Sequence, residues 1–106
     1  MKLAILESPY AGDIEANVEY AQKCIHDMLL RGEAPYASHL LYTQPNVLDD
    51  TNPQERELGL FAGFVWKRVE GVLTVFYTDR GISSGMQLAI DYCIEHKKPY
   101  EMRKLY

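Results

Sequence analysis

The fold is decided by the stretch Val72-Leu-Thr-Val-Phe-Tyr-Thr-Asp-Arg-Gly-Ile-Ser-Ser-Gly-Met86. Its first six residues are all apolar, β-branched or aromatic, which predicts a buried strand. A polar loop follows, and Ser83-Ser84-Gly85 predicts the start of a helix. This order places hydroxyls and free backbone N–H groups at a helix N-terminus, where the helix dipole favours a phosphate or a carboxylate. The alternative is that the serines only cap the helix.

Length and composition limit the class of protein. The 106 residues predict a single domain over 1–106, and 47% hydrophobic with 25% charged residues exclude disorder. A net charge of −4 without a basic stripe argues against a nucleic-acid partner. The two cysteines form no CxxC pair, and the first apolar run is too short for a leader or a membrane span. We therefore expect a cytoplasmic protein that has no membrane partner.

Apolar periodicity and helix-start signals predict strands alternating with helices. The expected strands span 2–7, 34–38, 72–77 and 100–103, and the expected helices begin after Asp13, Asn52 and Ser83 and end before Gly32, Gly71 and Pro99. Pro35 confines the second strand to a sheet edge, since proline cannot donate to a ladder. The polar connection over 39–51 is long enough to predict a functional loop. On the first helix, the expected inner face holds Ile14, Val18, Ala21, Ile25, Met28 and Leu29.

The order βαβαβαβ predicts an α/β fold, specifically a three-layer α/β/α sandwich of the Rossmann-like or flavodoxin-like type. Right-handed crossovers give a mostly parallel four-stranded sheet in the order 2-1-3-4. The first and third strands are then neighbours, and the loops 8–13 and 78–85 meet beyond their carboxyl ends. Neither loop has the GxGxxG or GxxxxGK[ST] pattern, and no His, Cys or carboxylate spacing fits a metal. We expect neither a cofactor nor a metal.

Three features together resemble the nucleoside 2-deoxyribosyltransferase-like superfamily, and more closely its small phage and bacterial branch. They are a first strand ending at Ser8-Pro-Tyr-Ala-Gly-Asp13, a histidine after the second strand, and the turn Tyr77-Thr-Asp-x-Gly-Ile-Ser-x-Gly-Met86. The resemblance covers nearly the whole chain and includes relatives that hydrolyse deoxynucleoside monophosphates. It implies that the first loop and the serines before the last long helix hold a phosphate, which makes candidates of Tyr10, Gly12, Ser83, Ser84 and Gly85.

One position departs from the family pattern. The nucleophilic glutamate of the family lies four residues after the glycine that opens the last helix, and counting from Gly85 gives Ala89. A methyl group cannot attack C1′, so the family mechanism cannot run unchanged. The candidates for a catalytic role are Asp79, His39 and Asp13, each with a structural alternative such as a turn or cap residue. Glu7 is expected to be an outward-facing strand end.

The full set of predicted ligand-binding residues lies in the loops and at the strand ends: Ser8, Tyr10, Gly12, Asp13, His39, Tyr77, Asp79, Ser83, Ser84 and Gly85. In this set, the rings of Tyr10 and Tyr77 are candidates for stacking on a base. On the second long helix, Phe61, Phe64 and Trp66 form a broad apolar surface that predicts a homodimer or a higher homo-oligomer.

Three functions follow from these observations. The first is a protein that binds a nucleotide or nucleoside and acts on the N-glycosidic bond of a (deoxy)nucleotide. The second, which Ala89 favours, is a non-catalytic binder that sequesters or senses a nucleotide. The third is a dimeric interaction protein whose loops bind no specific ligand.

Overall fold

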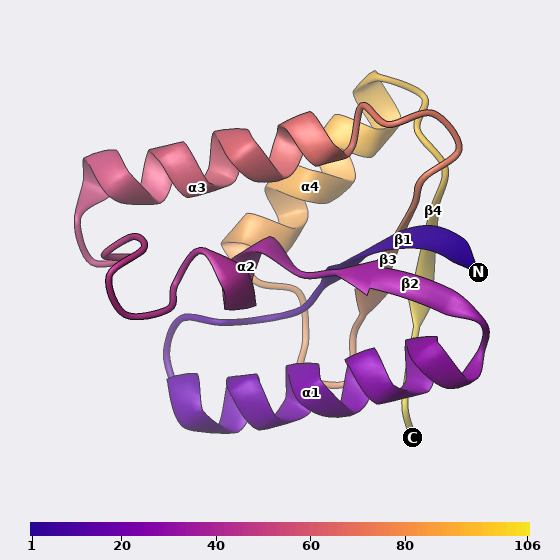
Figure 1. Cartoon of the computed structure of the whole chain (residues 1–106), viewed down its shortest axis with the longest axis horizontal. Coiled ribbons are helices and arrows are strands. Elements are labelled where there is room, and N and C mark those ends of the chain that lie inside the picture. Colours follow the sequence, from indigo (N-terminus) through magenta and orange to yellow (C-terminus); the bar gives the residue numbers. More distant parts are fainter.

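A four-stranded, all-parallel sheet with helices on both faces forms the centre of the computed structural model, which describes residues 1–106 (Figure 1). The strand order is β2-β1-β3-β4, so the predicted α/β fold and strand order are confirmed. Helix α1 covers one face, and α3 and α4 lie on the other. The elements are β1 (Lys2–Glu7), α1 (Ile14–Leu30), β2 (Glu33–Tyr36), α2 (Ser38–Leu41), α3 (Pro53–Trp66), β3 (Leu73–Tyr77), α4 (Ser84–Glu95) and β4 (Tyr100–Arg103).

The three long helices begin at side-chain caps that the sequence predicts. The carboxylate of Asp13 accepts a hydrogen bond from the Ala16 N–H at 3.2 Å, and the Asn52 side chain accepts two such bonds at the start of α3. The Ser83 hydroxyl accepts from the Met86 N–H at 3.2 Å. These bonds satisfy N–H groups that have no acceptor inside the helix, and so they fix where each helix starts.

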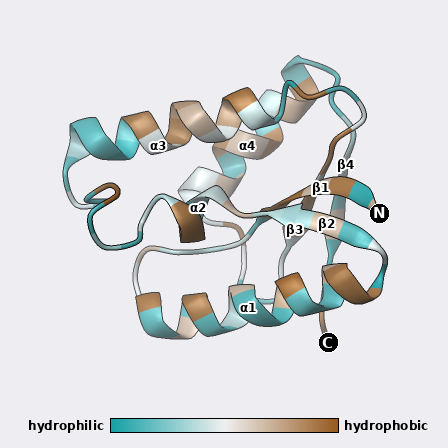
Figure 2. Ribbon diagram, in the orientation of Figure 1, coloured by the Kyte–Doolittle hydropathy of each residue, from teal (hydrophilic) through white to brown (hydrophobic).

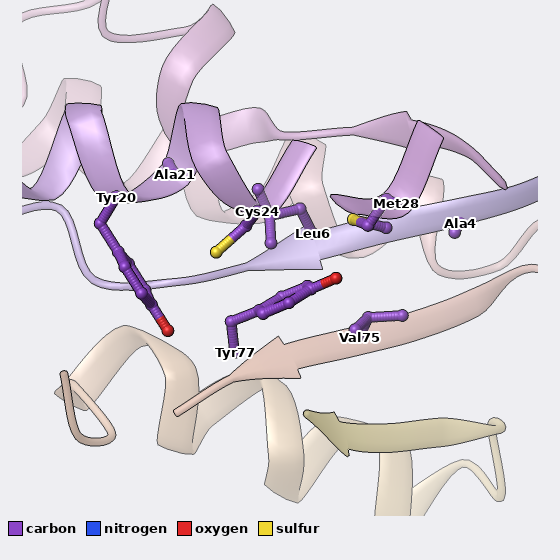
Figure 3. Close-up of a cluster of buried hydrophobic side chains, with 8 residues drawn as sticks. All are labelled: Ala4, Leu6, Tyr20, Ala21, Cys24, Met28, Val75 and Tyr77. Carbon is purple, nitrogen blue, oxygen red and sulfur yellow. The ribbon is translucent and has the colours of Figure 1, made fainter. Parts of the chain in front are cut away.

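The sheet is buried on both faces because its central strands carry apolar side chains on both sides. Along β3, Val75 and Tyr77 point toward α1, whereas Phe76 points toward α4. The cluster on the α1 side comprises Ala4, Leu6, Tyr20, Ala21, Cys24, Met28, Val75 and Tyr77 (Figure 3). The cluster on the other side comprises Phe76, Met86, Ala89, Ile90 and Cys93.

Helix α1 is rotated relative to the inner face that the apolar pattern predicts. Ile14 and Leu29 are half exposed, whereas Asn17 and Tyr20 are buried. The Tyr20 hydroxyl donates to Asp79 at 2.6 Å, and the Asn17 amide donates to two backbone carbonyls of the loop after β1. These specific bonds compensate for burying polar groups, so hydrogen bonding as well as hydrophobicity sets the rotation.

The segment that follows α1 differs in two ways from the prediction. Strand β2 begins one residue earlier, at the buried Glu33, and ends two residues earlier, at Tyr36. Residues 38–41 then form the short helix α2 instead of a loop, with the N–H groups of Leu40 and Leu41 bonded to the Ala37 carbonyl. Pro35 lies in an edge strand, as predicted. None of the helices combines the length and apolar character needed to cross a bilayer.

Candidate functional site

A cleft opens beyond the carboxyl end of β1, on the face of the sheet that carries α3 and α4. Its walls are the loop after β1, α2, α3 and the N-terminus of α4. The cavity volume is about 130 Å³, which is room for roughly ten waters at about 10–15 Å³ each. A cavity of this volume can hold a small molecule and is larger than the voids that imperfect packing leaves.

The floor of the cleft carries a buried ion pair between Lys67 of α3 and Glu7 of β1. The ammonium nitrogen lies 2.5 Å from the carboxylate oxygen, and the Lys67 side chain is only 2% exposed. Burying a lysine charge is costly unless it is paired, so Glu7 holds Lys67 in place. The expectation of an outward-facing Glu7 is wrong, because side chains alternate along β1 and Glu7 points away from the α1 face that Leu6 occupies.

Ser8 and His39 form a second polar pair beside the first. The Ser8 Oγ lies 2.8 Å from His39 Nε2, whereas His39 Nδ1 is buried without a hydrogen-bond partner. Burial lowers the pKa of His39 below its usual value; Glu7 opposes this shift and Lys67 adds to it. The imidazole is therefore neutral at neutral pH, and its Nδ1 has no hydrogen-bond partner within the chain.

The N-terminus of α4 forms the wall beside these pairs. Ser83, Ser84 and Gly85 line the cleft, and Ser83 caps the helix. The backbone N–H groups of Ser84 and Gly85, in the first turn, have no acceptor inside the helix. Their N–H groups and the helix dipole favour an anion at this wall.

The remaining walls carry aromatic rings as well as charged side chains, namely Asp50, Glu55 and Arg56. Tyr10 lines the cleft from the first loop, Tyr42 from the turn after α2, and Phe64 from α3. Tyr42 is held in place because its hydroxyl accepts a hydrogen bond from the Trp66 indole at 3.1 Å. The cleft thus offers ring faces at one side and hydrogen-bond donors at another.

The structure brings six of the ten predicted ligand-binding residues to this cleft: Ser8, Tyr10, His39, Ser83, Ser84 and Gly85. Gly12 and Asp13 do not line it. Both are exposed at the start of α1, where the Asp13 carboxylate caps the helix. Asp13 is therefore placed where a structural role accounts for it.

Tyr77 and Asp79 lie on the opposite face of the sheet and do not line the cleft. The Tyr77 hydroxyl donates to Asp27 at 2.6 Å and accepts from Arg103 at 3.1 Å, and burial raises its pKa to about 12. Arg103 also forms a bidentate ion pair with the buried Glu33, with N–O distances of 2.9 and 3.1 Å. We call Tyr20, Asp27, Glu33, Tyr77, Asp79 and Arg103 the α1-side network.

Asp79 is fully engaged within that network. It accepts from the Tyr20 hydroxyl at 2.6 Å and from the backbone N–H groups of Leu105 and Tyr106 at 2.9 and 3.3 Å. Burial acts to raise the pKa of Asp79, but these hydrogen bonds outweigh it and hold the pKa below its usual value. Of the three catalytic candidates, only His39 lies in the cleft.

The sequence prediction missed Glu7 and Lys67, the two buried charges of the cleft. A signal for Lys67 was present, since it lies four residues after Gly63 and three after Phe64 and so shares their helix face. No group of three or more histidine, cysteine, aspartate or glutamate side chains is placed to hold a metal ion.

The fold and the cleft define a small α/β protein with a ligand-sized site at the carboxyl edge of a parallel sheet, where such folds bind small molecules. The family model described as a domain of unknown function, DUF7768, matches residues 2–103, and the chain belongs to this family. No curated protein and no solved structure matches the chain.

Proposed function

We propose that the cleft binds a nucleotide or nucleoside and that its phosphate, when present, sits at the N-terminus of α4. The observation that carries the proposal is that this helix start lines the same cleft as the Glu7–Lys67 and Ser8–His39 pairs. A nucleotide has an anionic end, a hydroxylated sugar and a flat base. The helix N–H donors suit the first, the two polar pairs suit the second, and the aromatic side chains suit the third. The resemblance of the two loops to deoxyribosyltransferase-like proteins supports the same ligand class.

Each part of the ligand has a partner of suitable chemistry. The N–H groups of Ser84 and Gly85 donate to phosphate oxygens. The neutral His39 and the Glu7 carboxylate bond sugar hydroxyls, and the ring of Tyr10 or Tyr42 stacks on the base. The charge of Lys67 is neutralised by Glu7, so the α4 N-terminus and Arg56, which also lines the cleft, supply the attraction for the anion.

Chemistry at the N-glycosidic bond would depend on Glu7. Ala89 lies in the cleft wall and is buried, so the family position holds no carboxylate. Glu7 also lines the cleft and is the carboxylate that a buried lysine orients. We propose that Glu7 takes the role of the nucleophile or of the group that stabilises an oxocarbenium ion.

The second candidate is a non-catalytic protein that sequesters or senses a nucleotide. The observation that favours it is the engagement of Glu7 by Lys67 at 2.5 Å. A carboxylate that accepts a short hydrogen bond from an ammonium group is a weaker nucleophile than a free carboxylate.

Calorimetric titration with deoxynucleoside monophosphates and the matching nucleosides tests the anion site. Ser84→Glu places a negative charge at the α4 N-terminus, and we expect it to weaken monophosphate binding by about tenfold or more, as expected when hydrogen bonds to a charged group are lost. Gln22→Glu on the exposed side of α1 adds the same charge away from the cleft and serves as the control. Equal monophosphate affinity in Ser84→Glu and the control contradicts the proposed site.

Chromatographic detection of free base separates the two candidates. Base release that is abolished in Glu7→Gln and retained in Asp50→Asn, which changes another carboxylate of the cleft wall, supports the enzyme. Tight binding without base release supports the sequestering or sensing protein. Ala89→Glu is expected to create or increase base release, because it restores a carboxylate at the position where the resemblance places the nucleophilic glutamate.

A further inference from the structure

The outer face of α3 carries a row of exposed apolar side chains. Leu58, Phe61 and Val65 are 59%, 57% and 54% exposed, and Val69, just beyond the helix, is 37% exposed. Their spacings of three and four residues place them along one line of the helix surface. Figure 2 shows hydrophobic segments, in brown, along the length of α3. We call Leu58, Phe61, Val65 and Val69 the outer stripe.

The outer stripe lies on the side of α3 opposite the cleft. Leu60, Gly63, Phe64 and Lys67 face the cleft, and at about 100° per residue their mean direction is roughly opposite to that of the outer stripe. Gly63 is the only buried apolar position that α3 contributes to the body of the protein. A row of large apolar groups exposed to water indicates a binding surface.

Two charges flank the outer stripe on one edge. Glu57 lies before its first residue and Arg68 before its last, both are exposed, and neither forms an ion pair within the chain. The helical path continues to Arg68 and Val69, whose N–H groups bond the carbonyls three residues back at 3.1 and 3.2 Å. Opposite charges thus stand at opposite ends of the same edge.

We propose that a second copy of this chain covers the outer stripe through an antiparallel pairing of the two α3 helices around a two-fold axis near residues 62–63. Residues on the same edge of two antiparallel helices meet each other, so Glu57 of each copy lies opposite Arg68 of the other. A parallel pairing would instead bring opposite edges of the two helices together, so Glu57 and Arg68 would not meet and both charges would stay unpaired. The self-complementary charge pattern therefore selects a second copy as the occupant.

The same axis also aligns the apolar groups. It sets Phe61 over Val65 of the other copy at the centre and Leu58 over Val69 toward each end. The central contacts exclude water, while the two ion pairs form the rim, as in protein interfaces generally. The inference rests on the outer face of α3 and is independent of what the cleft binds.

Sedimentation equilibrium over a concentration series tests the pairing. The wild-type chain is expected to be a dimer that dissociates on dilution. Phe61→Glu is expected to raise the dimer dissociation constant by about 30-fold or more, the effect of losing an interface anchor. Leu88→Glu replaces a similarly exposed apolar residue on α4 and is expected to leave the constant unchanged. Circular dichroism checks that each variant remains folded.

Charge reversal makes the test specific to the antiparallel pairing. Glu57→Arg and Arg68→Glu are each expected to weaken the dimer, and the double variant is expected to restore it, because both ion pairs then reform with their signs exchanged. Because these residues are exposed, folding does not depend on them. A wild-type chain that stays monomeric, a dimer that Phe61→Glu leaves intact, or a double variant no tighter than the single ones overturns the proposal.

Discussion

The α1-side network and the cleft use similar residues on opposite faces of one sheet, but they differ in how completely those residues are bonded. In the α1-side network, Arg103 donates to Glu33 and Tyr77, and Asp79 accepts from three donors. In the cleft, His39 keeps an unpartnered nitrogen, and the N–H groups of Ser84 and Gly85 at the start of α4 have no acceptor inside the helix. Complete bonding marks a structural cluster, whereas incomplete bonding beside a cavity marks a place for a ligand.

The difference follows from the cost of burying polar groups. A buried donor or acceptor without a partner costs about 1–3 kcal/mol, so folded chains retain few of them. Those in the α1-side network are paired within the chain. At the cleft, His39 Nδ1 has no partner within the chain. The predictions below test this contrast, beginning with the largest effect.

Removing Arg103 is expected to have the largest effect on stability. Arg103→Met leaves Glu33 buried without its partner, and such a loss costs about 3–5 kcal/mol. The free energy of unfolding from urea denaturation measures it. Ligand affinity of the folded fraction is expected to be unchanged, because Arg103 does not line the cleft.

Two further variants sharpen that result. Arg31→Met removes an arginine whose ion pair with Asp27 is exposed, and it is expected to cost less than about 1 kcal/mol. The double variant Arg103→Met with Glu33→Leu is expected to recover most of the loss, since no unpaired charge remains buried. A double variant as unstable as Arg103→Met would contradict the electrostatic explanation.

Removing one hydroxyl from the α1-side network is expected to have an intermediate effect. Tyr20→Phe deprives Asp79 of a donor and the Asp79 N–H of its acceptor at 3.0 Å, which costs about 1–3 kcal/mol. Tyr10→Phe removes a tyrosine hydroxyl from the cleft, where no partner within the chain is lost, and is expected to leave the unfolding free energy nearly unchanged. Thermal and urea denaturation compare the two. Equal losses would remove the distinction between the regions.

The smallest expected effect is the pH dependence that His39 contributes. Its pKa is lowered in the folded state by burial, so the unfolded chain binds more protons below about pH 6.5. The stability from the neutral imidazole is present above that pH and is lost as the pH falls. Unfolding free energies measured between pH 8 and pH 5 are expected to flatten in His39→Gln and to keep the wild-type slope in His26→Gln, which changes an exposed histidine. An unchanged slope in His39→Gln would contradict the prediction.

The sequence is sufficient to predict most of the fold. Asn52-Pro53, Ser83 and Gly32 mark element ends by local chemistry, and their predicted bounds lie close to the observed ones, whereas α3 ends at Trp66, before the end predicted at Gly71. The rotation of α1 was not predictable from its apolar pattern. Two hydrogen-bonding residues, Asn17 and Tyr20, decide it: Asn17 bonds the loop that precedes the helix, and Tyr20 bonds Asp79 in the distant loop after β3.

The cleft was predictable only in part. Ser8, His39 and Ser83 follow strands or open a helix, so topology alone brings them to one edge of the sheet. Glu7 and Lys67 are sixty residues apart, and their pairing depends on which side of β1 faces α3 and on how α3 is turned. Helix α3 is apolar on both sides, and its sequence therefore leaves that turn undefined. Asp79 resembled a site residue because the loop containing it leads to the cleft, yet its side chain turns to the other face.

Gly63 gives the wall formed by α3 an adjustable position. A β-carbon there would lie 3.1 Å from the Ser38 hydroxyl, so the absence of a side chain lets α3 sit close to α2. A larger residue at position 63 would push α3 away from α2 and so change the shape of the cleft, which both helices line.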